Sequence, residues 1–116
     1  MEQKTFHSDL WKKMDDFAHI IYRVTKKFPK EELFGITSQL RRSSLSVILN
    51  YIEGYARGVG KAYKNFLLIS YGSLKELRYL LEFSFKEAYL PNDEYLVLLR
   101  LSDEIGAMTW STMRNL

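Results

Sequence analysis

Three short breaks divide the sequence into four long segments, each with the periodicity of an amphipathic helix. The breaks are Pro29 with the residues after it, Gly58-Val59-Gly60 and Leu90-Pro91-Asn92. Proline and glycine end helices, and no part of the chain alternates apolar and polar residues as a strand would. Short connections place consecutive long helices side by side and antiparallel. We therefore predict an all-α, antiparallel up-down-up-down four-helix bundle that forms a single domain over residues 1–116.

The four predicted helices can be bounded from the same signals. Ser8 or Asp9 can cap the first helix, and Asn92 or Asp93 can cap the fourth, because a short side-chain oxygen accepts from the free amides of a first turn. The connection over residues 30–35 has room for a helical turn of its own. The limits that we predict are about Ser8–Phe28, Ile36–Arg57, Lys61–Tyr89 and Asn92 or Asp93 to Met113.

The second predicted helix carries a stripe of small residues at three- and four-residue steps: Ser43, Ser46, Asn50 and Gly54. Small residues let two helix backbones approach closely, so we expect a tight contact along this stripe. Gly72-Ser73 suggests tight packing inside the third helix too, since glycine costs about 1 kcal/mol there relative to alanine. Residues 45–52 are apolar nearly all round, which indicates a helix covered on more than one side.

Composition narrows the class of protein. Hydrophobic residues make up 47% and charged residues 27% of the chain, which is typical of a folded domain and not of a membrane protein. No apolar run approaches the roughly 20 residues of a membrane span, and no cationic leader opens the sequence. Cysteine is absent, which excludes disulfides, thiolate metal sites and a cysteine nucleophile. We expect a cytoplasmic protein with no membrane partner.

The sequence offers little material for catalysis or metal binding. We expect His7 to lie in a flexible N-terminus, and His19 has a ligand-type residue at helical spacing only in Asp15. Residues 54–61 fail as a phosphate-binding loop, because their glycine spacing is wrong, and we interpret them as a helix C-cap and turn. Glu53, on the mostly apolar second helix, should meet a cation or a hydroxyl. We therefore predict no enzyme, no catalytic residue, no cofactor and no metal site.

Charge is mildly basic and unevenly distributed. The net charge is +3 and the pI about 9.1. The first three helical segments carry the surplus, whereas the last contains Asp93, Glu94, Asp103 and Glu104. This asymmetry permits an anionic partner without demanding one. Aromatic residues reach 15%, and because amphipathic rings are frequent at interfaces, they indicate self-association.

Several motifs occur in a recognisable order along the chain. They are Leu10-Trp11-Lys12, Phe28-Pro29-x-x-Glu32-x-x-Gly35, Gln39-Leu40-Arg41-Arg42-Ser43, Asn50-x-x-Glu53-Gly54-x-x-Arg57, Tyr63-x-x-Phe66-Leu67 and Gly72-Ser73-x-x-Glu76-Leu77. Together they resemble the bacterial four-helix-bundle family named after the intervening sequences of 23S ribosomal RNA genes. The resemblance extends from about Leu10 to Met113. Residues 48–52 are bulkier than is usual in that family.

The resemblance implies a compact antiparallel bundle that assembles into a ring-like homopentamer. It also implies a link to nucleic acid, because a related branch is the accessory subunit of reverse transcriptases in diversity-generating retroelements. That subunit binds nucleic acid and the polymerase. The partners to expect are therefore other copies of the chain, RNA or DNA, and a polymerase-type protein.

Two functions from different classes follow. The first is a nucleic-acid-associated oligomeric adaptor, in which Arg42, Arg57, Lys61 and Lys64 cluster at one bundle end and its turn. Lys75 and Arg78 would extend this site along the third helix. The second is a protein–protein scaffold that uses exposed aromatic residues and the acidic fourth helix and binds no nucleic acid. A third, purely structural role for the basic residues is ion pairing, for example between Arg78 and Glu82 four residues later.

Overall fold

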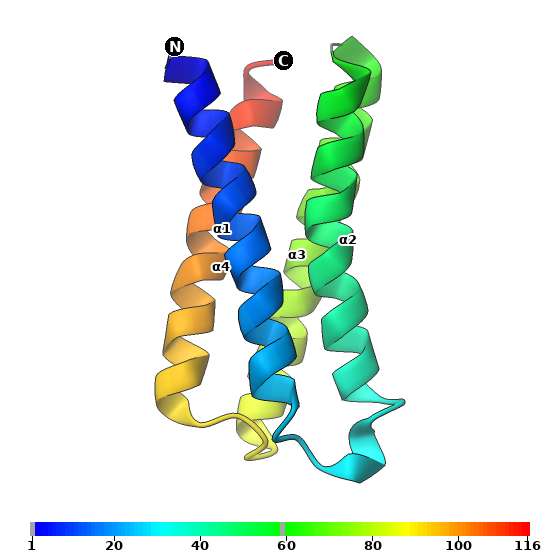
Figure 1. Ribbon diagram of the computed structural model, residues 1–116, viewed down its shortest axis with the longest axis vertical. Coiled ribbons are helices and arrows are strands. Elements are labelled where there is room, and N and C mark those ends of the chain that lie inside the picture. Colours follow the sequence, from blue (N-terminus) through cyan, green and yellow to red (C-terminus); the bar gives the residue numbers. More distant parts are fainter. Residues whose placement is uncertain (1, 59) are drawn as a thin grey trace.

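The chain forms four long helices in an antiparallel bundle, as predicted (Figure 1). The computed structural model describes residues 2–58 and 60–116, with side chains from residue 5 onward; Val59, in the second predicted break, lies outside them. The helices are α1 (Glu2–Thr25), α2 (Ile36–Arg57), α3 (Gly60–Lys86) and α4 (Asn92–Arg114), with a short 3-10 helix, η1 (Lys30–Glu32), before α2. No strand occurs among the described residues. The described helices are also too polar to include a membrane span.

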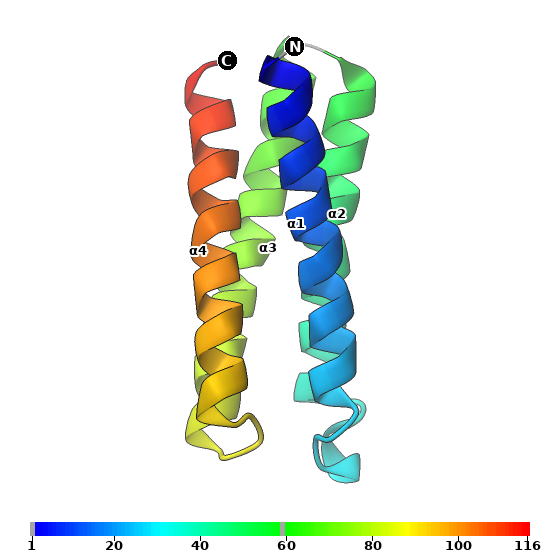
Figure 2. The same cartoon turned by 60° about the vertical axis from the view of Figure 1, so that its left-hand side comes forward.

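The helices alternate in direction. In Figure 1, α1 and α3 run from the end where the N-terminus lies to the opposite end, and α2 and α4 run back. Each helix packs against its two neighbours in the square: α1 contacts α2 and α4, and α3 contacts α2 and α4. Both termini therefore lie at the same end as the connection between α2 and α3 (Figure 2). We call this the hairpin end.

The helix limits agree with the predictions at α2, whereas α1 and α3 end at Thr25 and Lys86, three residues before the predicted ends, and the predicted caps differ too. α1 begins at Glu2, so Ser8 and Asp9 lie inside the helix and the prediction that either one caps it is wrong. The N-cap position of α4 is Pro91 without a side-chain bond, so capping by Asn92 or Asp93 is wrong too. The carboxylates of Asp93 and Glu94 in that first turn still interact favourably with the positive end of the helix dipole.

The apolar face of α1 and the turn after it belongs to the core. Its six residues recur at alternating steps of four and three and are all buried: Leu10, Met14, Phe17, Ile21, Val24 and Phe28. On α3, Leu67, Leu74, Leu77 and Leu81 are buried at the same kind of spacing. The pattern stops where α3 ends at Lys86, and Ala88 is exposed in the turn with a positive φ of 64°.

The predicted close contact along the small residues of α2 is confirmed, and its partner is α3. A methyl group added at Gly54 would lie 2.9 Å from Cβ of Phe66, closer than real side chains approach. The Oγ atoms of Ser46 and Ser73 are 2.7 Å apart, and the Ser70 hydroxyl donates to the carbonyl of Val47 at 2.7 Å. The α2–α3 contact is the most extensive in the bundle.

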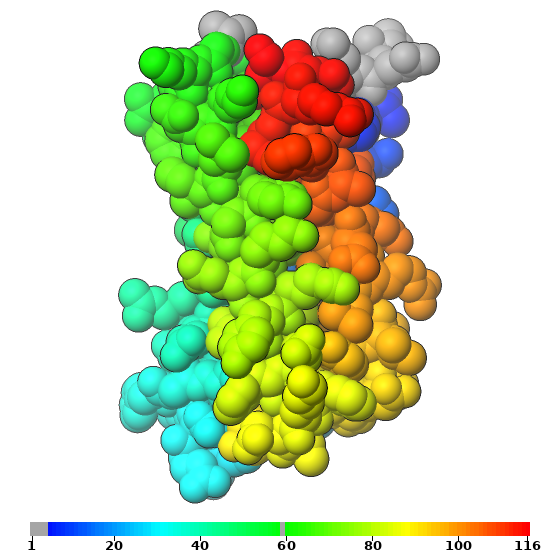
Figure 3. Space-filling model, turned by 180° about the vertical axis from the view of Figure 1, so that it is seen from behind, coloured from blue at the N-terminus to red at the C-terminus, as the bar shows by residue number. Residues whose placement is uncertain are grey.

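The expectation of tight packing at Gly72-Ser73 is wrong for the glycine and confirmed for the serine. Gly72 is exposed and has open space around its Cα, whereas Ser73 lies in the close contact with Ser46. The apolar stretch of α2 is covered on more than one side as predicted, since α2 contacts both α1 and α3, although Leu45 and Leu49 remain 38% and 57% exposed. On the face behind the view of Figure 1, α3 and α4 run side by side along the length of the molecule (Figure 3).

Candidate nucleic-acid interface

The basic surplus of the chain is concentrated in one hairpin. Residues 36–75, which form α2 and the first half of α3, contain six basic residues and one acidic residue, a net charge of +5. The rest of the chain has a net charge of −2. Because phosphate binding depends on local positive charge, this hairpin and the surfaces beside it are the first places to search.

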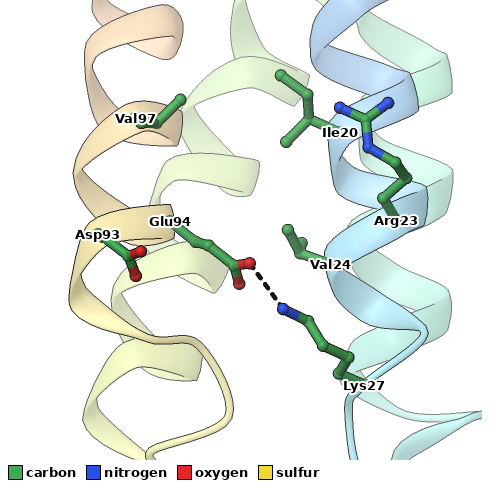
Figure 4. A pocket seen from close by; sticks show the side chains of 7 residues that line it. All are labelled: Ile20, Arg23, Val24, Lys27, Asp93, Glu94 and Val97. Carbon is green, nitrogen blue, oxygen red and sulfur yellow. Dashed lines mark hydrogen bonds and ion pairs between the residues drawn. The ribbon is translucent and has the colours of Figure 1, made fainter.

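The acidic residues of α4 have a different role, since two of them neutralise lysines, one in α1 and one in the turn after it. Lys13 Nζ is 2.8 Å from Glu104 Oε2, and Lys27 Nζ is 2.6 Å from Glu94 Oε2. The hydrogen bond from Lys13 lowers the pKa of the Glu104 carboxyl. Figure 4 shows the second pair crossing the groove between α1 and α4, with Asp93 beside it. Two lysines at this seam are therefore neutralised, whereas Arg23 lines the groove without an ion pair to a described residue.

Arg42 does not join the predicted cluster at the hairpin end. It lies fifteen residues before Arg57 on the same helix, which separates the two by about 22 Å along the helix axis. Arg42 lines a shallow groove between α2 and α3 together with Glu76 and Tyr79. A carboxylate in the same groove makes this arginine a poor isolated phosphate ligand.

Arg57 lies at the hairpin end, but its charge is already compensated. Its guanidinium donates to Glu53 Oε1 from Nη2 at 2.8 Å and from Nε at 3.2 Å, and it lies 5.6 Å from the centre of the Phe66 ring. The predicted cationic partner of Glu53 is thus confirmed, although Glu53 is exposed. Such an exposed pair contributes about 0.3–0.5 kcal/mol to the helix.

Lys61 and Lys64 are the free cations of the hairpin end. Both are exposed in the first turns of α3, and neither forms a hydrogen bond or ion pair with any residue that the structure describes. The positive end of the α3 dipole disfavours cations here, and no acidic residue occupies the first turn to compensate. Their placement therefore does not serve helix stability.

Lys75 and Arg78 lie farther along α3, on the side that faces α4. With Lys64 they belong to a stripe at steps of four, three, four and three residues: Lys64, Leu68, Tyr71, Lys75 and Arg78. Lys75 Nζ is 5.0 Å from the centre of the Tyr71 ring. Arg78 pairs across the seam with Asp103 of α4, with Nε 3.5 Å from Oδ1. The prediction that Arg78 pairs with Glu82 is wrong, since Glu82 binds Lys86.

The seam between α3 and α4 forms a groove of about 200 Å³. Its walls include Tyr71 and Lys75 of α3 and Trp110 of α4, and Leu74, Ser102 and Gly106 are buried residues that also line it. The rings of Tyr71 and Trp110 have their centres 5.5 Å apart at an angle of 43°. Trp110 is 50% exposed. We call this surface the α3–α4 groove.

Tyr71 and Trp110 are not among the predicted site residues. The signal that was available is the spacing of the lysines. Lys64, Tyr71 and Lys75 fall on one helical face beside the core face, so an aromatic residue is placed between cations on the same surface. On α4, Trp110 and Arg114 show the same four-residue step.

His7 is not in a flexible segment, contrary to the prediction. It lies in α1, where Nδ1 hydrogen-bonds to the hydroxyl of Tyr51 and the imidazole stacks on Tyr55 with ring centres 3.5 Å apart. Trp11 packs edge-on against the same imidazole. Burial lowers the pKa of His7 and raises that of the Tyr51 hydroxyl. This cluster anchors the start of α1 to the end of α2.

The second histidine lies on the surface in a pair with one carboxylate. His19 Nε2 is 3.3 Å from Asp15 Oδ1 on an exposed face. Within the described ranges, no three His, Asp or Glu side chains are grouped so that they could hold a metal ion. The interpretation of residues 54–61 as a helix end and turn is confirmed, because α2 ends at Arg57 and Gly58 and Gly60 have φ values of 89° and 77°.

Comparisons with known proteins identify a matching family and a similar solved structure. A family model described as "23S rRNA-intervening sequence protein" matches residues 7–111. A crystal structure of a protein of unknown function from the S23 ribosomal protein family of Bacteroides thetaiotaomicron superposes with a TM-score of 0.86. The two sequences are 24% identical, and the match covers 94% of this chain and 98% of that one. No curated protein matches the chain.

Proposed function

The chain belongs to the 23S rRNA-intervening sequence protein family, and from this premise we propose that it is a non-enzymatic, homo-oligomeric protein that associates with RNA through basic side chains. The family description names ribosomal RNA insertions, and RNA is a polyanion whose phosphates are bound by lysine and arginine. The proposed role is that of an adaptor in the cytoplasm, which holds RNA without transforming it.

One observation carries the RNA part of this proposal. The hairpin of α2 and the first half of α3 has a net charge of +5, and three of its lysines have no ion-pair partner among the described residues: Lys61, Lys64 and Lys75. Outside this hairpin, Lys13 and Lys27 are instead paired with acidic residues of α4. Uncompensated lysines on one hairpin favour binding of an external anion over internal ion pairing.

Exposed apolar side chains support the homo-oligomeric part. Leu45 and Leu49 lie on the outer side of α2, and Leu68 and Ile69 lie on α3 with about half of their surface exposed. Leu45 and Leu49 are four residues apart and share one helix face, and exposed apolar neighbours of this kind are typical of a contact between proteins. Assembly into a ring of five would raise the net charge from +3 per chain to about +15, which strengthens attraction of RNA.

Absolute mass by light scattering after gel filtration tests both parts together. The protein is measured alone, with an RNA that contains stems and loops at low salt, and with the same RNA at high salt. We expect a pentamer that becomes heavier with RNA and returns to its own mass as salt increases, because counterion release drives the association. A monomer, or a mass that RNA does not change at low salt, contradicts the proposal.

The alternative is a protein–protein scaffold without affinity for RNA, and the exposed leucines of α2 are the observation that favours it. A polymerase-type protein would be the partner to test. Charge reversal at Lys64 and Lys75, which form no ion pair with described residues, separates the two functions. Loss of RNA binding without loss of a protein partner supports the RNA-associated function, and the opposite pattern supports the scaffold.

A further inference from the structure

We infer that the α3–α4 groove is the surface that holds the RNA, and that it takes a single strand whose bases stack on Tyr71 and Trp110 while Lys64, Lys75 and Arg114 contact its phosphates. This inference rests on the proposed RNA-associated function and narrows it to one face and one form of RNA. It uses two of the predicted basic residues, Lys64 and Lys75, and adds Arg114. Arg78 lies beside the groove in a pair with Asp103, and Arg42, Arg57 and Lys61 lie outside the groove.

The aromatic pair is the first argument. Tyr71 and Trp110 approach each other from opposite walls of the groove, and Trp110 keeps half of its surface in solvent. Exposed rings that line a groove can stack on bases, and stacking is worth about 1–3 kcal/mol per base in proteins that bind single strands. By contrast, the stacked pair of Phe85 and Tyr95 lies farther along the same seam and has no exposed ring among the large exposed residues.

The positions of the cations are the second argument. Lys64 precedes Tyr71 by two helical turns, and Lys75 follows it by one turn on the same face. Arg114 follows Trp110 by one turn on α4, and because α3 and α4 are antiparallel, Arg114 and Lys64 lie at the same end of the groove. Cations therefore flank the aromatic pair on both sides along roughly 20 Å of groove.

The remaining charges of the groove leave a positive balance. Asp103 is its acidic residue, and it is engaged by Arg78. Lys64, Lys75 and Arg114 form no ion pair with described residues, although Lys75 lies over the Tyr71 ring. A base that stacks on Tyr71 would thus place its neighbouring phosphate within reach of Lys75.

The geometry favours a single strand over a duplex. Bases in a helix are stacked on each other and their faces are covered, so they have no surface to offer to Tyr71 and Trp110. Unpaired nucleotides in loops and at ends expose both faces of the base. Two further grooves lack a pair of facing rings. The groove between α1 and α4 has no aromatic residue in its lining and is crossed by the Lys27–Glu94 pair, and the groove between α2 and α3 has Tyr79 as its single aromatic lining residue.

The test is fluorescence anisotropy with a labelled oligouridylate of about ten nucleotides, a length within the site sizes of single-strand grooves. Trp110→Leu removes the ring but keeps an apolar side chain, and Lys75→Glu reverses one cation. Their matched controls are Trp11→Leu on α1 and Lys26→Glu after α1, which change the same residue types outside the groove. We expect each groove variant to weaken binding about tenfold and each control to change it less than about twofold.

Salt dependence adds a second readout. Three phosphate contacts predict a slope of log K against log salt near −2, and Lys75→Glu should reduce its magnitude by about 0.7 or more. Lys26→Glu should leave the slope unchanged. A duplex of the same length should bind the wild type about tenfold more weakly than the single strand, because it offers no free base to stack.

A third readout does not depend on the fold of any groove variant. In Trp11→Phe, Trp110 is the only tryptophan. We expect the oligouridylate to quench its emission with the same midpoint as the anisotropy titration, since a base would contact the indole.

The outcomes separate failure of this inference from failure of the proposed function. If the wild type binds RNA but Trp110→Leu and Lys75→Glu bind equally well, or if Trp110 emission does not change, RNA does not bind in the α3–α4 groove. The inference is then overturned and the proposed function stands. If the wild type binds neither the oligouridylate nor an RNA with stems and loops, both fail. If the groove variants change the oligomer mass but not RNA affinity, the groove is a subunit contact and the inference is overturned.

Discussion

The two seams on either side of α3 are built from different kinds of residue. Toward α2, small residues bring the backbones together, with Gly54 in contact with Phe66 and the hydroxyls of Ser46 and Ser73 bonded to each other. Toward α4, the large side chains of Tyr71 and Trp110 contact each other in the wall of a groove. The same helix thus takes part in the most extensive contact of the bundle and in a much smaller one.

This difference indicates how a small bundle can combine stability with a binding surface. Close backbone contact satisfies the hydroxyls of Ser46, Ser70 and Ser73 internally, so these groups of the α2–α3 seam are not available to a ligand. On the α4 side, the indole of Trp110 and the ammonium group of Lys75 remain exposed to solvent. We therefore expect changes in the α2–α3 seam to alter stability and changes in the α3–α4 groove to alter binding.

The largest expected effect is a loss of stability when the close α2–α3 contact is disrupted. Gly54→Ala should lower the free energy of unfolding by about 1–3 kcal/mol, because the new methyl group would lie 2.9 Å from Phe66 Cβ and 3.3 Å from the carbonyl oxygen of Tyr63. Gly72→Ala is the matched control on an open surface, and it should stabilise the helix by about 0.5–1 kcal/mol. Thermal unfolding followed by circular dichroism measures both. Equal shifts in the two variants would show that the seam is not tight at Gly54.

The next largest expected effect is a loss of RNA affinity after a change in the α3–α4 groove. Tyr71→Leu should weaken oligouridylate binding about fivefold or more, since one stacking ring is lost. Its melting temperature should change by only a few degrees, because the leucine keeps apolar contact with Trp110. Anisotropy and thermal unfolding on the same sample provide the comparison. A large loss of stability with unchanged affinity would mean that Tyr71 is a packing residue.

A change of pH should loosen the α1–α2 contact and leave the groove intact. Burial lowers the pKa of His7 below its ordinary value of 6.5, so the folded state binds fewer protons than the unfolded state as pH falls through that range. The contribution of His7 to stability is therefore present above pH 6.5 and is lost at lower pH. Between about pH 7.5 and pH 5, the melting temperature of the wild type should fall by a few degrees more than that of His7→Phe.

The comparison of these two proteins isolates His7, because both contain His19 and the same carboxylates. Parallel pH profiles would show that the bond to Tyr51 does not contribute to stability. RNA affinity should change equally with pH in both proteins, since His7 contacts α2 and not the groove.

The smallest expected effect is an increase in RNA affinity. Asp103→Asn removes the acid that pairs with Arg78 and frees one more cation in the groove. RNA affinity should rise about twofold to threefold at low salt, and the salt slope should steepen by about 0.7. Stability should change by less than about 1 kcal/mol, as is usual for exposed pairs. Unchanged binding would place Arg78 and Asp103 beyond the path of the RNA.

Much of the fold could be predicted because its signals are local. The apolar spacing from Leu10 to Phe28 and the breaks at Pro29, Gly58 and Pro91 determine helix positions without knowledge of the neighbours. The start of α1 could not be predicted in this way. His7 binds Tyr51, a residue 44 positions away, and this contact is not visible in the local sequence.

The candidate site was predicted less well, for a related reason. Individual basic residues are visible in the sequence, but whether each is free depends on its neighbours in the fold. Arg57 is engaged by Glu53 and Arg78 by Asp103, whereas Lys64 and Lys75 remain without ion pairs among the described residues. The pairing of Tyr71 with Trp110 joins two helices, and no spacing within either helix predicts it.

Photo-crosslinking tests the central claim most directly. A thiouridine-labelled single strand is bound to the wild-type protein at low salt and irradiated, and the crosslinked peptides are identified by mass spectrometry. Our account predicts crosslinks at Tyr71 and Trp110 that disappear at high salt. Crosslinks confined to aromatic residues on other faces, such as Trp11, Tyr55 or Tyr79, would contradict it.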